Sequence, residues 1–176
     1  EFFEEQKKIY LISNFKNIPE KFFRQIKIND LVVFMNTSFH SNNKNLDKNE
    51  KLLFLRENSK SFWGFKQHFS KKYNKVFFLA SHNYNNNNNH IRLFNNFKEN
   101  KELLNFKELY KDINYTKNKI PTTGFITYLY LKKKYPNSKI ILVGFYGYHK
   151  DYKITITHDA NFEQKYYSDH KITNLK

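Results

Sequence analysis

The stretch PTTGFITYLYLKKKYPNSKIILVGF, residues 121–145, decides the fold class of this chain. Its first part predicts a helix over residues 125–135, which begins after the proline and two threonines and ends before Pro136. Its second part, KIILVGF at residues 139–145, is a short apolar run of the kind that forms buried strands. A helix that leads directly into a buried strand is typical of α/β domains.

Further apolar runs precede this stretch, and each has the length and composition of a buried strand. They lie at residues 8–12, 30–35, 51–55 and 75–80. Strands that alternate with longer mixed segments favour a mainly parallel sheet flanked by helices. The 176 residues are about the length of one domain. We therefore expect residues 1–176 to form a single Rossmann-like α/β domain.

Helical patterns occupy two of the segments between these runs. Residues 19–26 predict a short helix that begins near a proline. Residues 91–111 predict one or two amphipathic helices with an apolar stripe facing the core. The stripe consists of Leu93, Phe97, Leu104 and Leu109.

Polar composition predicts two loops. Residues 85–89 are all asparagine and are flanked by His82 and His90, so we interpret them as a mobile loop tip that follows a strand. No cysteine or carboxylate cluster accompanies the two histidines, and we therefore expect no metal site there. Residues 41–50 are predicted to form a solvated loop.

The amino-acid composition limits the cellular compartments in which the protein is expected. The chain contains no cysteine, which excludes disulfide bonds and thiolate metal sites. It has no unbroken apolar run of about 18 residues, the length that spans a bilayer, and no signal-peptide pattern near Glu1. These features predict a soluble protein and favour the cytoplasm.

The formal net charge of +15 predicts a surface that attracts anions. Nucleic acids, nucleotide phosphates, anionic lipids and acidic glycans are all candidates, because the sign of the charge does not distinguish among them. An AT-rich coding sequence is the alternative explanation, since it supplies the same abundant residues: Lys, Asn, Ile, Phe and Tyr.

Polar residues follow the first two predicted strands. Asn14 comes after the first, and Asn36 with Thr37 comes after the second. In open α/β sheets, ligands bind beyond the carboxyl ends of the strands, where these side chains could hydrogen-bond a base or a ribose. The alternative is plain turn chemistry, because short polar side chains also stabilise turns locally.

The PTTG segment combines several features of a ligand-binding helix start. Either Thr122 or Thr123 can cap the helix that follows, and Gly124 allows a close approach to the backbone. The amides and the positive dipole end of a helix favour anionic or polar ligand groups. An ordinary capped helix is the alternative.

The segment HDANFE, residues 158–163, contributes a candidate base. His158 has an ordinary pKa of about 6.5 and could take a proton from a substrate hydroxyl near neutral pH. On a helix, Glu163 would lie roughly 140 degrees away from His158, so the two are not expected to pair locally. A structural or merely exposed histidine is the alternative.

The order of these motifs resembles that of the sialyltransferases. In that family, a Pro-Ser/Thr-Ser/Thr-Gly segment and a later His-x4-Glu motif are characteristic, and PTTG at residues 121–124 and HDANFE at residues 158–163 are similar to them. The bacterial members that sialylate lipooligosaccharide share the general architecture. The resemblance extends over most of the chain but is carried by few residues.

The resemblance implies an inverting transfer of a sugar from a CMP donor to a glycan or glycolipid hydroxyl, without a metal or other cofactor. His158 matches the catalytic base, and Glu163 matches the motif glutamate, for which a structural role is expected. The remaining matched positions imply contacts with the CMP donor. They are Asn14, Asn36, Thr122, Thr123, Gly124, Tyr148 and Tyr152, and the two tyrosines match by position only.

The chain also departs from the family pattern. The first loop of the family usually reads Gly-Asn-Gly, whereas here Ser13 and Phe15 flank Asn14, and Phe15 is large enough to crowd the nucleotide. A transferase fold that has lost catalysis is therefore an alternative. The segment between Phe145 and His158 is short, which predicts a small acceptor lid or none, and it leaves the donor sugar open between sialic acid and a relative such as Kdo.

Two further observations bear on the class of function. The chain has no Asp-x-Asp pair, which metal-dependent nucleotide-sugar transferases commonly use to hold a divalent ion. A basic, aromatic-rich module that binds RNA is the competing class, but its aromatic residues lie in core patterns, and we expect no nucleic-acid partner. The basic surface is expected to favour peripheral contact with an anionic membrane, at the inner face, where a glycolipid acceptor lies.

Overall fold

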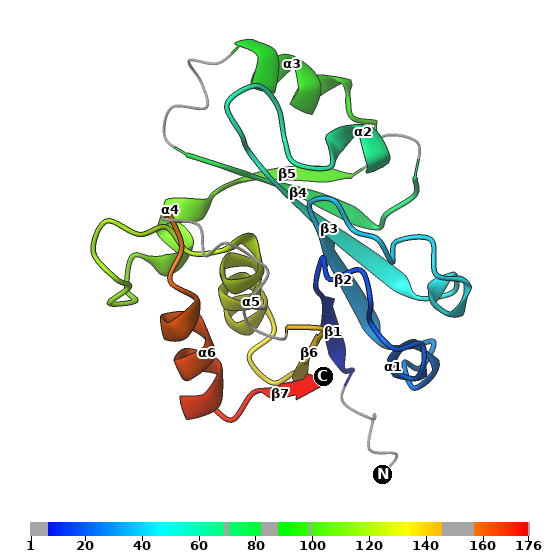
Figure 1. Ribbon diagram of the computed structural model, residues 1–176. Coiled ribbons are helices and arrows are strands. Elements are labelled where there is room, and N and C mark those ends of the chain that lie inside the picture. The colour runs from blue at the N-terminus through cyan, green and yellow to red at the C-terminus, as the bar shows by residue number, and fades with distance from the viewer. Residues whose placement is uncertain (1–6, 69–70, 82–87, 99, 146–156, 176) are drawn as a thin grey trace.

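The computed structural model describes residues 7–68, 71–81, 88–98, 100–145 and 157–175. Within these ranges, seven strands form one sheet in the order β5-β4-β3-β2-β1-β6-β7, and every neighbouring pair is parallel (Figure 1). The strands are β1 (Ile9–Ile12), β2 (Leu31–Met35), β3 (Glu50–Arg56), β4 (Lys75–Ala80), β5 (Lys101–Asn105), β6 (Ile140–Val143) and β7 (Thr173–Leu175). The predicted α/β class with a parallel, Rossmann-like sheet is confirmed.

Helices cover both faces of this sheet (Figure 1). One face carries α1 (Lys21–Arg24), α2 (Phe65–His68) and α3 (Asn88–Asn96), together with a 3-10 turn, η1 (Lys44–Leu46). The other face carries α4 (Phe106–Tyr110), α5 (Thr123–Lys134) and α6 (Ala160–Asp169). The sheet therefore separates two hydrophobic cores.

The strands read as unbroken apolar runs because both of their faces are buried. In β2, Val32 and Phe34 belong to the core beneath α1 to α3, whereas Leu31, Val33 and Met35 belong to the core beneath α4 to α6. Successive side chains of a strand point to opposite faces of the sheet, so one run supplies both cores.

Four of the five predicted strands have shifted ends, and β1 and β2 each begin one residue later than predicted. β3 extends one residue beyond the predicted range at each end, and β6 is shorter than predicted because it stops before Gly144. Gly144 has a φ of 77°, a conformation that disfavours other residues, and a Cβ there would lie 2.6 Å from the Oγ of Ser13. The chain therefore turns at Gly144, where β6 runs alongside the end of β1.

The prediction of one or two helices over residues 91–111 is confirmed only in part, because α3 and α4 lie there but a strand separates them. β5 lies between α3 and α4 and pairs with β4, with Leu103 opposite Phe78. The sequence of β5, KELLN, has no unbroken apolar run because β5 is an edge strand, and its pairing with β4 overrides the local helical pattern. As a result, Leu93 and Phe97 pack in one core, and Leu104 and Leu109 pack in the other.

The two predicted loops also need correction. Residues 41–50 contain η1, and Leu46 within it is fully buried, so this segment is anchored to the core rather than fully solvated. Asn88 and Asn89 begin α3, while His82 and residues 85–87 lie outside the described residues. His90 has a structural role, because its Nε2 lies 2.8 Å from the carbonyl oxygen of Asn58 and 2.7 Å from that of Ser61.

The strand order fixes where a ligand can bind. β1 lies between β2 and β6, so the chain moves outward from β1 on one side and returns on the other. Such a switch point leaves a crevice at the carboxyl ends of the strands. In the described part of the chain, no helix is both long and apolar enough to cross a bilayer.

Candidate functional site

A pocket of about 400 Å³ lies at the carboxyl ends of β1, β2 and β3. It is lined by Asn14, Asn36, Thr37, Arg56, Trp63, Ile120, Thr123, Thr157 and His158. These positions come from five separate segments of the chain. The pocket therefore brings together five residues that were predicted from sequence: Asn14, Asn36, Thr37, Thr123 and His158.

His158 lies just before Asp159, the N-cap of α6, and its ring is oriented by one hydrogen bond. The Nδ1 atom is 2.6 Å from the carbonyl oxygen of Ile120. A carbonyl can only accept, so Nδ1 carries the proton and Nε2 keeps a lone pair. The neutral ring can therefore accept a proton through Nε2.

The surroundings of His158 favour this neutral form. Burial lowers the pKa of His158, and the charges of Arg56 and Lys119 lower it further, while the hydrogen bond to Ile120 opposes them. The net pKa lies below the ordinary value of 6.5. The ring is therefore a base rather than an acid at neutral pH.

Glu163 joins the two sequence motifs. Its carboxylate accepts hydrogen bonds from the backbone N–H of Thr122 at 2.7 Å, from the Thr122 hydroxyl at 2.6 Å and from the Tyr115 hydroxyl at 2.9 Å. The side chain is only 5% exposed, and this burial raises the pKa of the carboxyl, although its donors and Arg56 oppose the shift. Glu163 thus holds the start of α5 against α6.

Thr122 and Gly124 do not line the pocket. The Thr122 hydroxyl accepts from the backbone N–H of Phe125 at 3.2 Å and caps α5. Gly124 is buried, and a Cβ at this position would lie 2.6 Å from the ring of Phe145. The structure thus shows that Gly124 packs closely against Phe145.

Asn36 positions its neighbours from the end of β2. Its backbone has a φ of 46°, its Oδ1 accepts from the N–H of Arg56 at 3.0 Å, and its Nδ2 donates to the Thr123 hydroxyl at 3.0 Å. The Thr123 oxygen is therefore used as an acceptor, and its own hydrogen remains for donation into the pocket. Asn36 therefore orients the Thr123 hydroxyl and ties the end of β2 to the end of β3.

Asn14 offers an acceptor. Its Oδ1 is buried, and no donor among the described residues reaches it. Phe15 follows Asn14 but is not among the residues that line the pocket. Phe15 packs against the core beneath α1 to α3, and its carbonyl lies 2.8 Å from Nε2 of His40.

Arg56 and Trp63 were not predicted from sequence. Arg56 ends β3, its Nη1 donates to the carbonyl oxygen of Pro121 at 2.6 Å, and its guanidinium lies 4.6 Å from the ring centre of Phe106. It is the one Lys or Arg among the described residues that line the pocket. Trp63 is 55% exposed, and its backbone N–H donates to the backbone carbonyl oxygen of Arg56 at 2.9 Å.

Comparisons with family models, curated proteins and solved structures found no match to this chain. The predicted contacts of Tyr148 and Tyr152 lie outside the described residues. Within the described ranges, no three His, Asp or Glu side chains gather in a way that could hold a metal ion.

A buried histidine supports the pocket from behind. His68 is fully buried, its Nε2 donates to the carbonyl oxygen of Asn36 at 2.7 Å, and its Nδ1 accepts from the Tyr73 hydroxyl at 2.5 Å. A protonated ring could not accept from Tyr73. The bond in this direction uses the neutral form of His68, and protonation would force the Tyr73 hydroxyl to become the acceptor.

We expect acid to destabilise the protein through His68. Burial lowers the pKa of His68 to about 4, while the ordinary value is 6.5. A lowered pKa gives stability that is fully present above pH 6.5 and is lost as the pH falls toward 4, by about 3 kcal/mol in total. Urea unfolding of the native chain and of His68→Gln at several pH values in this window measures the loss. The variant should be less stable near neutral pH and should lose less on acidification, whereas parallel losses would contradict this role.

Proposed function

We propose that this chain is a metal-independent, inverting glycosyltransferase that moves sialic acid or a related sugar from a CMP donor to a hydroxyl of a glycan or glycolipid. The observation that carries the proposal is the convergence of Asn14, Asn36, Thr123 and His158 on one pocket at the ligand-binding end of the sheet. These are positions that match sialyltransferase motifs, and they are far apart in the sequence.

The hydrogen bonding of His158 supports its role as the base. In this proposal, Nε2 takes the proton of the acceptor hydroxyl, and the hydroxyl oxygen attacks the anomeric carbon. The bond from that carbon to the CMP phosphate breaks, and its electron pair leaves with CMP. The orientation of the ring by the Ile120 carbonyl keeps Nε2 ready for this step.

Arg56 and the start of α5 suit a leaving phosphate. The guanidinium has five N–H donors, of which the bond to Pro121 uses one, and the others can stabilise negative charge. Thr123 is the first residue of α5, so its hydroxyl lies at the positive end of the helix dipole. A CMP donor carries one phosphate, and these groups can balance its charge without a bridging metal.

The pocket also has groups for the rest of a nucleotide. The buried Oδ1 of Asn14 can accept from an amino or hydroxyl group of the donor. The exposed ring of Trp63 offers a flat surface on which a base or sugar ring can stack. The net charge of +15 favours peripheral contact with an anionic membrane that presents a glycolipid acceptor, and we place the enzyme at the cytoplasmic face.

A nucleotide-binding domain without catalysis is the second candidate. The observation in its favour is that both polar side-chain atoms of Asn36 are already used within the protein. Such a domain would bind CMP at the same pocket and release none from a CMP-sugar. A nucleic-acid-binding module would instead bind oligonucleotides in a strongly salt-dependent way and ignore CMP.

The direct test is CMP release from CMP-sialic acid and CMP-Kdo in EDTA, with a mixture of glycan acceptors, and a thermal shift with CMP. The proposal predicts both release and a shift. A shift without release would identify the inactive domain, and the absence of both would exclude the pocket as a CMP site.

Thr123→Val should weaken CMP binding because it removes the hydroxyl that faces the pocket. A lost hydrogen bond of this kind costs about 1 kcal/mol, or about a fivefold rise in Kd. Thr127→Val is the matched control: Thr127 lies one turn further along α5, is fully buried and does not line the pocket. Calorimetric titration with CMP should show the loss for Thr123→Val alone, and equal affinities would remove Thr123 from the donor site.

A further inference from the structure

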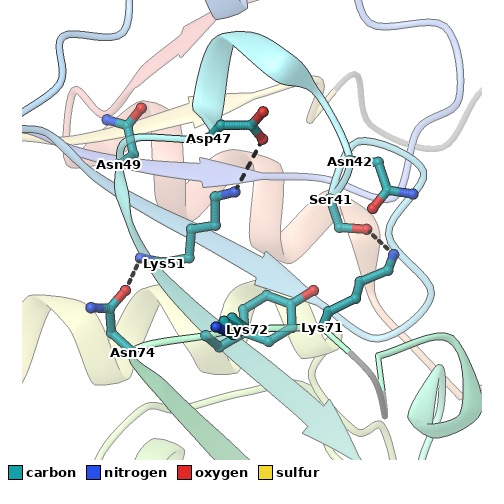
Figure 2. Close-up of a pocket in the computed structure, with 9 residues that line it drawn as sticks. Ser41, Asn42, Asp47, Asn49, Lys51, Lys71, Lys72 and Asn74 are labelled. Atoms are coloured by element: carbon teal, nitrogen blue, oxygen red, sulfur yellow. Dashed lines mark hydrogen bonds and ion pairs between the residues drawn. The ribbon is translucent and has the colours of Figure 1, made fainter.

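A second pocket, of about 480 Å³, lies at the opposite end of the sheet (Figure 2). Lys51 is the second residue of β3 and Asn74 directly precedes β4, so this pocket lies at the amino ends of two strands, while the candidate site lies at carboxyl ends. It is lined by Ser41, Asn42, Asp47, Asn49, Lys51, Lys71, Lys72, Tyr73 and Asn74. Nothing in the proposed transfer reaction uses these residues.

Positive charge is in excess in this second pocket. Three lysines line it against one carboxylate, that of Asp47, which lies 3.8 Å from the Nζ of Lys51. The Asp47 side chain is 64% exposed, so it offsets the lysines only weakly. The pocket therefore keeps a surplus of cations.

Lys71 has no carboxylate partner within the described part of the chain. Its Nζ donates to the Ser41 hydroxyl at 2.8 Å, and Figure 2 shows the side chain reaching toward Ser41, while Lys51 reaches toward Asp47. Burial lowers the pKa of Lys71, and the charge of Lys51 lowers it further. These two lysines thus repel each other, and an anion between them would relieve the repulsion.

The uncharged groups of the pocket also favour an acceptor-rich ligand. Asn74 accepts from the backbone N–H of Lys51 at 2.7 Å through its Oδ1, which leaves its NH₂ group as a donor. The side-chain amide of Asn49 donates to the carbonyl oxygens of Lys27 at 2.7 Å and Asp30 at 3.0 Å, and these bonds hold Asn49 in place at the side of the pocket. The groups that remain in the pocket are mostly donors, and a phosphate supplies several strong acceptor oxygens.

We propose that this second pocket binds a phosphate ester, with Lys51, Lys71 and Lys72 supplying the charge. The volume exceeds that of inorganic phosphate, so the phosphate belongs to a larger molecule, which is either a soluble phosphomonoester or a lipid headgroup. This inference does not depend on the proposed transferase activity, because the two pockets share no lining residue.

The test compares two double variants that lose the same charge. Lys71→Gln with Lys72→Gln alters the pocket, and Lys132→Gln with Lys133→Gln alters exposed lysines in the last turn of α5. The probes are glycerol 3-phosphate in solution and phosphatidylcholine vesicles with or without phosphatidic acid. The pocket variant should bind the phosphate probe about tenfold more weakly, in line with the loss of charge-assisted hydrogen bonds. The α5 variant should bind it almost as well as the native chain.

The possible results distinguish a soluble phosphate ester from a lipid headgroup, and they include results that would overturn the proposal. Binding of glycerol 3-phosphate that is lost in the pocket variant supports a soluble ligand, and binding of phosphatidic acid vesicles alone, lost in the same way, supports a headgroup. Equal weakening in both double variants would assign the effect to net charge and overturn the proposal. So would the absence of binding to either probe, or a pocket-dependent affinity for oligonucleotides alone.

Two checks keep the result independent of folding and of the candidate site. The exposed Lys72 can be changed alone to Gln if the double variant unfolds, and it should still weaken binding. Thr123→Val should leave glycerol 3-phosphate binding unchanged. If Thr123→Val abolished it, the phosphate would lie in the candidate site and the proposal would fail, whatever the outcome of the CMP-release test.

Discussion

His158→Ala should lower CMP release by about a hundredfold or more, because a positioned general base typically contributes that much to a proton transfer. The substitution removes Nε2 and one partly exposed hydrogen bond to Ile120, so the fold should lose only about 1 kcal/mol. CMP affinity should change little. Initial rates with CMP-sialic acid at saturating acceptor measure the effect.

His170→Ala is the matched control for this experiment. His170 follows α6, is exposed and stacks on Tyr166, away from the pocket. Its removal should leave the rate unchanged. Release that persists in His158→Ala at the native rate would remove His158 from the mechanism.

The pH profile of the native chain gives a second readout of the same base. Because burial and nearby cations lower the pKa of His158, the ring stays neutral down to a pH below 6.5. The rate should therefore hold through neutral pH and fall only at lower pH, as the ring becomes protonated. A fall that begins well above pH 6.5 would point to another group.

Gly64→Ala should destabilise the fold by about 3 kcal/mol or more, the range expected for a clash combined with an unfavourable backbone conformation. Gly64 has a φ of 77°, and a Cβ there would lie 2.3 Å from the carbonyl oxygen of Asn36. The clashing atoms belong to the backbone, so no side chain can rotate away. Urea unfolding at pH 7 measures the loss.

Gly124→Ala is the same change in a different setting. Its Cβ would also meet an atom at 2.6 Å, but this atom belongs to the Phe145 ring, which can rotate, and the new alanine lies in a helix. The cost at Gly124 should therefore be much smaller than at Gly64. Similar losses in the two variants would show that the contact with Asn36 can relax.

The central strands could be predicted from sequence because they are buried on both faces and need no partner to be recognised. β5 and β7 could not, because KELLN and TNL are edge strands that owe their conformation to pairing with β4 and β6. The same reason explains why the strand between the two helices of residues 91–111 was not predicted. Local pattern alone does not contain the hydrogen bonds that a neighbouring strand supplies.

The residues of the candidate site likewise fall into those that could be predicted from sequence and those that could not. Asn14 and Asn36 follow strands and Thr123 begins a helix, so a general rule about α/β sheets predicted that they would meet at one end of the sheet, where they line the pocket. Arg56 reaches the pocket only through its position in the sheet and its bond to Pro121, a residue distant in the sequence. Trp63 joins the pocket through a backbone bond to Arg56, which no local pattern indicates.

The pairing of β1 with β6 has a consequence for folding. Ile9 lies opposite Ile140, so the centre of the sheet closes only after most of the chain is available. Such a distant contact requires closure of a long loop and predicts slow folding relative to helical proteins of similar size. The pocket residues within 120–123 and 157–158 are synthesised late, so the pocket is complete only when most of the chain has been made. An amino-terminal fragment that ends before β6 should therefore have no affinity for CMP, even if its first strands associate.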